Sequence, residues 1–90
     1  MKHLNIRIQG KVQGVFFRAS TREKAQALHI SGFVKNCEDG SVYVEAEGKE
    51  QDLEQFLVWC HNGPEAAMVT AVDQSEGPLE DFSGFTIRRF

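Results

Sequence analysis

Residues 4–18 read LNIRIQGKVQGVFFR, and this stretch carries the first strand, loop and helix of the predicted fold. Hydrophobic residues alternate with polar ones over residues 4–9, which is typical of a half-buried β-strand. A loop over residues 10–17 follows, and a helix is expected at about residues 18–29. The apolar stripe expected of that helix consists of Phe17, Thr21, Ala25 and Leu28.

The rest of the chain predicts further strands and one more helix. Strands at residues 32–36 and 42–47 flank Asp39-Gly40, a dipeptide typical of hairpin turns. A second amphipathic helix, which ends near residues 61–64, and strands at residues 68–72 and 85–90 complete the pattern. The helix is recognised by the apolar spacing of Leu53, Phe56, Leu57 and Cys60.

The element order predicts an α+β fold, the ferredoxin-like α/β sandwich. It is βαββαβ with an extra C-terminal edge strand, and both apolar helix stripes are buried if two helices cover one face of an antiparallel sheet. Val42, Val44 and Ala46 are then expected to face the core. Tyr43, Glu45 and Glu47 should face the other way.

The composition limits the classes of protein to which this chain can belong. The 90 residues, 41% of them hydrophobic, predict a single domain over 1–90. The net charge of −3 argues against nucleic-acid binding through bulk electrostatics, and no apolar run approaches the roughly 20 residues of a membrane helix. Without a signal-peptide pattern, we expect a cytoplasmic monomer. The two cysteines are interpreted as reduced thiols, although the sequence leaves a Cys37–Cys60 bridge open.

The loop after the first strand has the features of a small phosphate-binding site. Backbone N–H groups in such a loop can form a concave anion cradle, and the following helix N-terminus adds unpaired donors. Arg18 adds a permanent charge whose planar fork matches phosphate oxygens. The residues expected to form the cradle are Gln13, Gly14, Val15, Phe16, Phe17 and Arg18.

The predicted topology brings Asn36 to the same place. The first and second predicted strands run in the same direction, because the first helix returns the chain between them. Asn36 ends the second strand and is the polar side chain best placed to face a bound anion. Its neighbour Cys37 is expected to point to the opposite face and into the core.

Several routes to phosphate chemistry are excluded by the residues. There is no Walker-type phosphate loop, no cysteine within residues 10–18, no cluster with metal-ligand spacing and no pair of carboxylates near the loop. A leaving group must then depart unaided as a stable anion, as the carboxylate of an acyl phosphate does. The attacking water would be held by Asn36, whose amide both donates and accepts.

Two segments resemble the signatures of the acylphosphatase family. Residues 8–18, IQGKVQGVFFR, resemble the first signature, and residues 32–36, GFVKN, with the glycines at 40 and 48, resemble the second. The resemblance implies a ferredoxin-like hydrolase that converts small acyl phosphates to carboxylate and inorganic phosphate without metal or cofactor. It places the catalytic arginine on Arg18, the water-orienting asparagine on Asn36 and a supporting threonine, out of contact with phosphate, on Thr21.

Two other functions remain open for the same residues, a phosphate-binding domain and an RNA-binding domain. A non-catalytic domain that binds phosphate or carbamoyl phosphate would need the same cradle. RNA binding requires aromatic residues on the open sheet face, where Tyr43 is the one obvious candidate. Phe16 is expected at the mouth of the site, and Arg88 and Arg89 are interpreted as charges that protect a sheet edge. The physiological acyl phosphate is not identified by the sequence.

Overall fold

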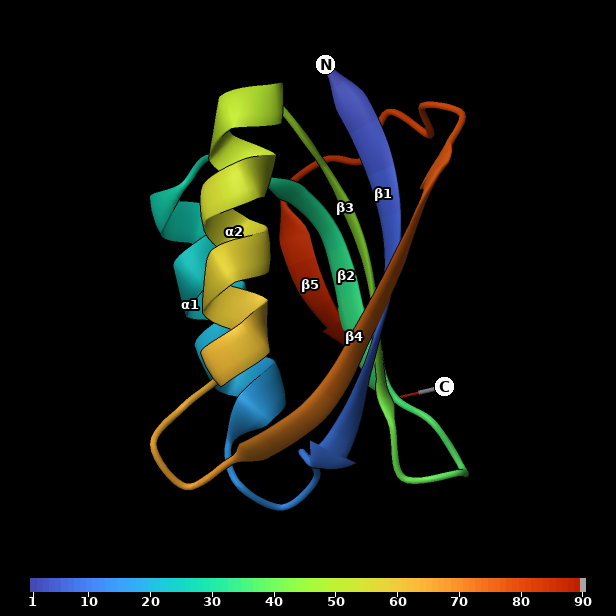
Figure 1. Ribbon diagram of the computed structural model, residues 1–90. Helices are drawn as coiled ribbons and strands as arrows, with labels where there is room; N and C mark the ends of the chain where they lie inside the picture. The colour runs from blue at the N-terminus through green and yellow to red at the C-terminus, as the bar shows by residue number, and fades with distance from the viewer. Residues whose placement is uncertain (90) are drawn as a thin grey trace.

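The computed structural model describes residues 1–89, which form one sheet with two helices on one face (Figure 1). The predicted element order is confirmed. The elements are β1 (Lys2–Lys11), α1 (Phe17–Ala27), β2 (Ser31–Asn36), β3 (Val42–Gly48), α2 (Glu50–Asn62), β4 (Met68–Gly77) and β5 (Phe85–Arg88).

The sheet has the strand order β4-β1-β3-β2-β5. The pairs β4/β1, β1/β3 and β3/β2 are antiparallel, as expected, but β5 pairs with β2 in parallel, so the sheet is mixed. β3 lies between β1 and β2. As Figure 1 shows, β1, β2 and β5 all run toward the lower part of the sheet, where β1 ends in the loop that enters α1.

The core lies between the sheet and the helices. α1 packs over β2 and β5, while α2 packs over β3 and β4. The alternation expected for β1 and β3 is confirmed, because the inward side chains of both strands are buried. The helices contribute Phe17, Thr21, Ala25, Leu53, Phe56 and Cys60 to the buried set.

α1 ends two residues earlier than the sequence predicts. The N–H of Ile30 donates to Ala25 O at 2.8 Å and that of His29 donates to Gln26 O at 3.2 Å, the paired bonds of a Schellman motif. His29 adopts the left-handed conformation that this motif requires, with φ 57°. The terminal strand is also shorter than predicted, since β5 ends at Arg88 and Phe90 lies outside the described residues.

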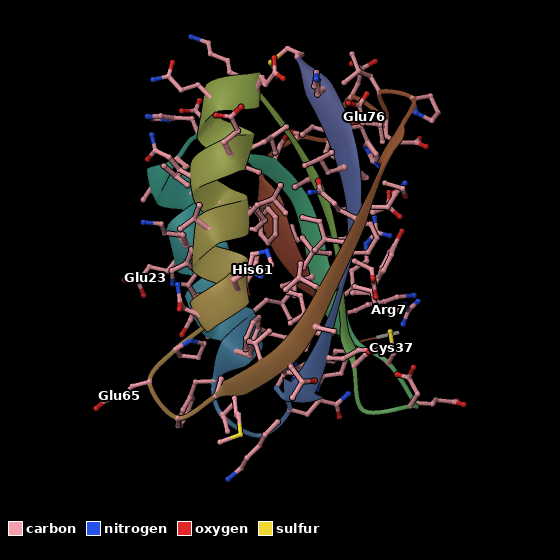
Figure 2. All side chains as sticks on the ribbon, in the orientation of Figure 1. Arg7, Glu23, Cys37, His61, Glu65 and Glu76 are labelled. Carbon is pink, nitrogen blue, oxygen red and sulfur yellow. The ribbon has the colours of Figure 1, made fainter. Side chains whose placement is uncertain are left out.

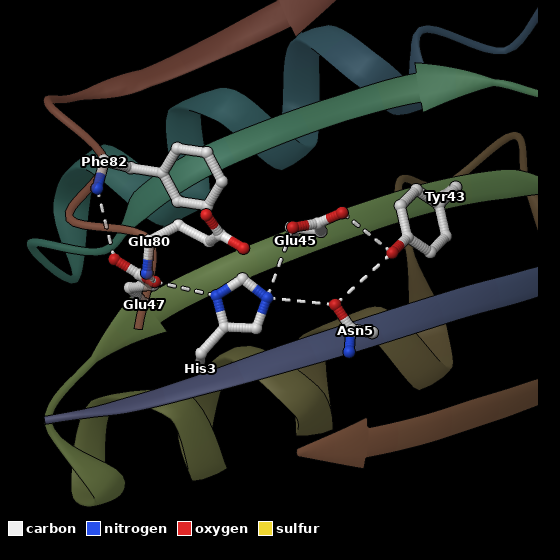
Figure 3. Close-up of polar contacts among 7 residues, drawn as sticks. All are labelled: His3, Asn5, Tyr43, Glu45, Glu47, Glu80 and Phe82. Carbon is white, nitrogen blue, oxygen red and sulfur yellow. Dashed lines mark hydrogen bonds and ion pairs between the residues drawn. The ribbon is translucent and has the colours of Figure 1, made fainter. Parts of the chain in front are cut away.

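The sheet face opposite the helices is partly covered by the 78–84 segment, which connects β4 to β5 (Figure 3). Glu47 points to this face, as expected, yet its side chain is only 3% exposed. Its carboxylate accepts hydrogen bonds from the backbone N–H groups of Glu80 and Phe82. It therefore fastens the connection to the sheet.

His3 lies beside Glu47 and is equally buried. Its Nδ1 is 2.7 Å from Glu47 Oε2, and its Nε2 is 2.9 Å from Asn5 Oδ1 and 3.2 Å from Glu45 Oε1. Burial opposes the charged form of His3, but its bonds to Glu47 and Asn5 and the two carboxylate charges outweigh burial and raise the pKa of His3. With oxygens at both ring nitrogens, the geometry suits an imidazolium.

Cys37 is not in the core, contrary to the sequence-based expectation. It is half-buried on the face away from the helices, where Arg7 Nη1 lies 3.5 Å from its Sγ (Figure 2). Strand alternation does place Cys37 on the face opposite to Asn36, as expected, but Asn36 faces the helices, so the opposite face is the one away from the core. Cys37 and Cys60 are both free thiols, and burial raises the pKa of Cys60 to about 12.

Candidate active site

A cavity of about 350 Å³ opens at the sheet edge where β1, β2 and β5 end. It brings together residues that are far apart in the sequence, from the loop before α1, the first turn of α1, the end of β2 and the end of β5. The residues that line it are Val12, Gly14, Phe16, Phe17, Arg18, Ala19, Asn36, Ile87 and Arg89.

The loop that forms one wall has an alternating backbone conformation. Gly14 has φ 74° and Phe16 has φ 62°, whereas Val15 between them has a negative φ. Alternation of this kind turns successive N–H groups toward one side and creates an anion-binding concavity. Among residues 1–89, none of the N–H groups at positions 13–18 has a hydrogen-bond acceptor. These donors are therefore available to a ligand.

The N-terminus of α1 adds to the positive potential of this wall. In the described part of the chain, no side chain caps the helix, and its first turn contains no acidic residue. The unpaired donors and the positive end of the helix dipole thus act without a neutralising carboxylate. Arg18, the second residue of α1, contributes its guanidinium to the same cavity.

Asn36 contributes the polar group at the end of β2. Its Oδ1 is buried, and it has no hydrogen-bond partner among residues 1–89. Leaving a buried carbonyl oxygen unpaired costs about 1–3 kcal/mol, so such groups call for an explanation. A donor held in the cavity, such as a water molecule, would satisfy this oxygen.

Gln13 connects the loop to the hairpin that carries Asn36. Its side-chain amide donates to the backbone carbonyls of Cys37 at 2.8 Å and Ser41 at 2.9 Å. Asp39 shapes the same turn, because it accepts from the Ser41 hydroxyl and N–H, and these bonds lower the pKa of Asp39. This positioning contact of Gln13 was not predictable from the sequence, since the two segments are not adjacent in the chain.

The structure places the predicted site residues in three groups. Gly14, Phe16, Phe17, Arg18 and Asn36 line the cavity. The side chains of Gln13 and Val15 do not line it: Gln13 holds the hairpin, and Val15 is 8% exposed in the core cluster. Thr21 is fully buried and donates to Phe17 O at 2.7 Å, one turn behind the cavity wall.

β5 and the residue that follows it supply two lining residues that the sequence-based interpretation missed. Ile87 and Arg89 reach the cavity because β5 pairs in parallel with β2 and ends beside Asn36. Arg88 points to the other face, where its guanidinium lies 3.8 Å from the ring centre of Phe33. Neither arginine therefore acts only as a charge that protects the sheet edge. Their positions were not predicted, because the parallel pairing of β5 with β2 was not recognised from the sequence.

The fold and the cavity together define a small ferredoxin-like domain with a candidate site at the β1–α1 loop. Known proteins with this fold are similar to the chain over most or all of its length. The acylphosphatase family model matches residues 4–87. An acylphosphatase of Thermotoga petrophila is 47% identical over 90 residues, which cover 100% of both chains.

Solved structures show the same likeness. The crystal structure of acylphosphatase from Bacillus subtilis is 36% identical, with a TM-score of 0.95 over 98% of this chain and 99% of that one. Full-length HypF in its phosphate- and nucleotide-bound form is 28% identical, with a TM-score of 0.87 over 97% of this chain but 12% of that one. The chain belongs to the acylphosphatase family, a family of hydrolases.

Proposed function

We propose that this protein is an acylphosphatase that hydrolyses the carboxyl–phosphate bond of small acyl phosphates. The observation that carries the proposal is that one cavity is lined by loop residues 14 and 16–18, whose N–H groups have no acceptor among residues 1–89, and by Asn36, whose Oδ1 has no partner among the same residues. The cavity combines hydrogen-bond donors that can bind an anion with one hydrogen-bond acceptor, Asn36 Oδ1. These are the two elements needed to hold a phosphoryl group and a water molecule.

The loop amides and Arg18 would bind the phosphoryl oxygens. Amides fixed by the alternating loop need no reorganisation during the reaction, and a guanidinium can donate to two oxygens at once. Both stabilise negative charge on the equatorial oxygens as the phosphoryl group is transferred. In this arrangement the protein contributes positioning and charge stabilisation.

Asn36 would orient the attacking water. Its Oδ1 accepts a hydrogen bond from the water, which directs a water lone pair at phosphorus. The new bond forms between the water oxygen and phosphorus, and the bond between phosphorus and the acyl oxygen breaks. The acyl oxygen leaves as a carboxylate with the bonding electrons, and the water proton passes to a phosphate oxygen. The products are a carboxylate and inorganic phosphate.

The leaving group defines the reaction that such a site can accelerate. A carboxylate is a stable anion and departs without a proton donor, whereas an alkoxide from an ordinary phosphate ester does not. The proposal is tested by comparing phosphate release from benzoyl phosphate and from phenyl phosphate, with and without EDTA. We expect hydrolysis of benzoyl phosphate at a rate that EDTA does not change, and little hydrolysis of phenyl phosphate. Equal rates on both substrates, or EDTA-sensitive activity, would contradict the proposal.

The likeness to one segment of HypF favours a second candidate, a non-catalytic domain that binds phosphate or carbamoyl phosphate. This chain spans 12% of HypF but the full length of the acylphosphatase of T. petrophila. The full-length match therefore supports catalysis. Protection of Arg18 from a guanidine-modifying reagent by phosphate, without any turnover of benzoyl phosphate, would favour the binding domain instead.

The proposal includes a cytoplasmic monomer that does not bind nucleic acid. The free thiols of Cys37 and Cys60 support a reducing compartment. On the sheet face that RNA-recognition domains use, Phe33 is 5% exposed and packs edge-on against Phe82 at 5.8 Å. It is therefore not free to stack on a base. Sedimentation of the purified protein, with and without a single-stranded oligonucleotide, tests both expectations.

A further inference from the structure

The cavity is larger than a phosphate group requires. Its volume of about 350 Å³ lies within the range of small-molecule sites, while a phosphate has five heavy atoms. The polar groups of the lining belong to the loop, Arg18, Asn36 and Arg89. The remaining lining is apolar, and its accessible parts come from Phe16, Ala19 and Ile87. Space next to the phosphoryl position is therefore bounded by hydrophobic side chains.

Phe16 is an unusual residue for its position. Its side chain is 82% exposed, so the ring gains little from burial. Its backbone is left-handed, with φ 62° and ψ 23°, a conformation that is costly for a bulky residue and that Gly or Asn adopts more readily. Neither packing nor backbone preference explains a phenylalanine here. Phe16 nevertheless lines the cavity, which points to a role in binding.

The opposite wall comes from β5. Ile87 is half-buried and Arg89 is exposed, and both line the cavity that Phe16 borders. An aromatic acyl group placed there would contact the Phe16 ring and the Ile87 side chain. Aromatic rings prefer such offset or edge-on contacts, and the arginine would add a favourable cation–π contact.

We propose that Phe16 is a specificity-determining residue, whose ring binds the acyl part of the substrate and favours aromatic over small acyl groups. This inference rests on the proposed acylphosphatase function and adds the class of acyl group to it. Arg89 defines the competing possibility, a preference for acyl groups that carry a second carboxylate. The experiment separates the two.

The test compares kcat/KM for benzoyl, acetyl and succinyl phosphate in wild type, Phe16→Ala and Phe16→Tyr. Val58→Ala is the matched control, because Val58 is 65% exposed on α2 and does not line the cavity. Phe16→Ala should lower kcat/KM for benzoyl phosphate about five- to tenfold and leave that for acetyl phosphate within about twofold. Phe16→Tyr should retain the preference for benzoyl over acetyl phosphate, because it keeps an aromatic ring. Val58→Ala should leave kcat/KM unchanged for both substrates.

Two further readouts exclude a purely structural effect. The inhibition constant of inorganic phosphate should stay the same in Phe16→Ala, because the loop amides and Arg18 remain. Thermal stability should not fall, because Phe16 is exposed and its left-handed backbone is strained.

Three outcomes would overturn the inference. Equal losses on benzoyl and acetyl phosphate would make Phe16 a support of the loop. A wild-type preference for succinyl phosphate that survives Phe16→Ala would assign specificity to Arg89. If wild type hydrolyses none of the three compounds, the proposed function fails and the inference with it, an outcome that differs from an altered ratio between substrates.

Discussion

At the level of single residues, Arg18 brings a fixed charge to the cavity at the start of α1. Arg18→Gln keeps a polar, though shorter, side chain and removes the charge and the planar fork. We expect kcat/KM for benzoyl phosphate to fall by at least about 10²–10³-fold, the loss typical of one oxyanion donor. Stopped assays of phosphate release measure this.

The control for Arg18→Gln is Lys11→Gln, since Lys11 is exposed at the end of β1 and does not line the cavity. It should retain activity within about twofold, because a solvated surface charge contributes little. A similar loss in both variants would mean that general electrostatic attraction, rather than the bidentate contact, explains binding.

Asn36 is proposed to have the complementary role of orienting the attacking water. In Asn36→Ala the amide that would orient the water is absent, while the loop amides and Arg18 are unchanged. We expect kcat to decrease strongly and the inhibition constant of phosphate to stay nearly constant. Steady-state kinetics with phosphate as competitor give both values. If phosphate binding weakens as much as kcat falls, Asn36 belongs to the anion cradle instead.

At the scale of the elements, the 78–84 connection depends on Glu47. Its carboxylate accepts from Glu80, Phe82 and His3 while it is almost completely buried. Glu47→Gln retains the size but places an NH₂ group against donors, so we expect a loss of about 2–4 kcal/mol in unfolding free energy. For a domain of this size, this corresponds to a decrease in Tm of roughly 10–25 °C.

Glu76→Gln is the matched control for Glu47→Gln. Glu76 also forms an ion pair, with Lys2 Nζ at 3.3 Å, but its carboxylate is exposed to solvent. Its loss should cost less than about 1 kcal/mol. Equal decreases in Tm for the two variants, measured by calorimetry, would show that the buried contacts of Glu47 do not hold the connection.

The helices and strands also differ in how well the sequence predicted them. Strands with a hydrophobic alternation, such as residues 4–8 of β1, were predictable because one face is buried. β4 extends to Gly77, five residues beyond its predicted end, because its backbone continues to pair with β1 although its exposed second half is polar and shows no hydrophobic alternation. Periodicity cannot detect such pairing.

The same distinction applies to the site. Arg18 and Asn36 were recognisable from local motifs and from the direction of the strands, and the structure brings both to one cavity. The contributions of Gln13, Ile87 and Arg89 depend on contacts between distant segments. Glu47 was placed on the correct face, but its burial depends on a connection that has no regular pattern.

At the scale of the whole molecule, stability should depend on pH through His3 and Glu47. His3 has a pKa raised above its ordinary value of 6.5, so its contribution is complete below pH 6.5 and is lost as the pH rises through the raised pKa. Glu47 has a pKa below its ordinary value of 4.5, because the N–H of Glu80, His3 and the N–H of Phe82 outweigh burial. Its contribution is lost as the pH falls through the lowered pKa.

Urea unfolding of wild type and His3→Gln across this range tests the pH dependence. The difference in unfolding free energy between the two proteins should be largest between about pH 4.5 and 6.5 and should shrink at alkaline pH. A difference that does not vary with pH would show that His3 stabilises the fold by packing alone, for instance through its stacking on Phe82 at 5.9 Å.

The proposed reaction requires that the cavity direct water to the phosphorus of an acyl phosphate. The most direct measurement is hydrolysis of benzoyl phosphate by the wild-type protein in water enriched in the heavy oxygen isotope, followed by mass spectrometry of both products. We predict that the heavy isotope enters inorganic phosphate and that the benzoate remains unlabelled. Label in the benzoate would mean attack at the carbonyl carbon, and phosphate release no faster than without the protein would mean no catalysis. Either result would contradict the account.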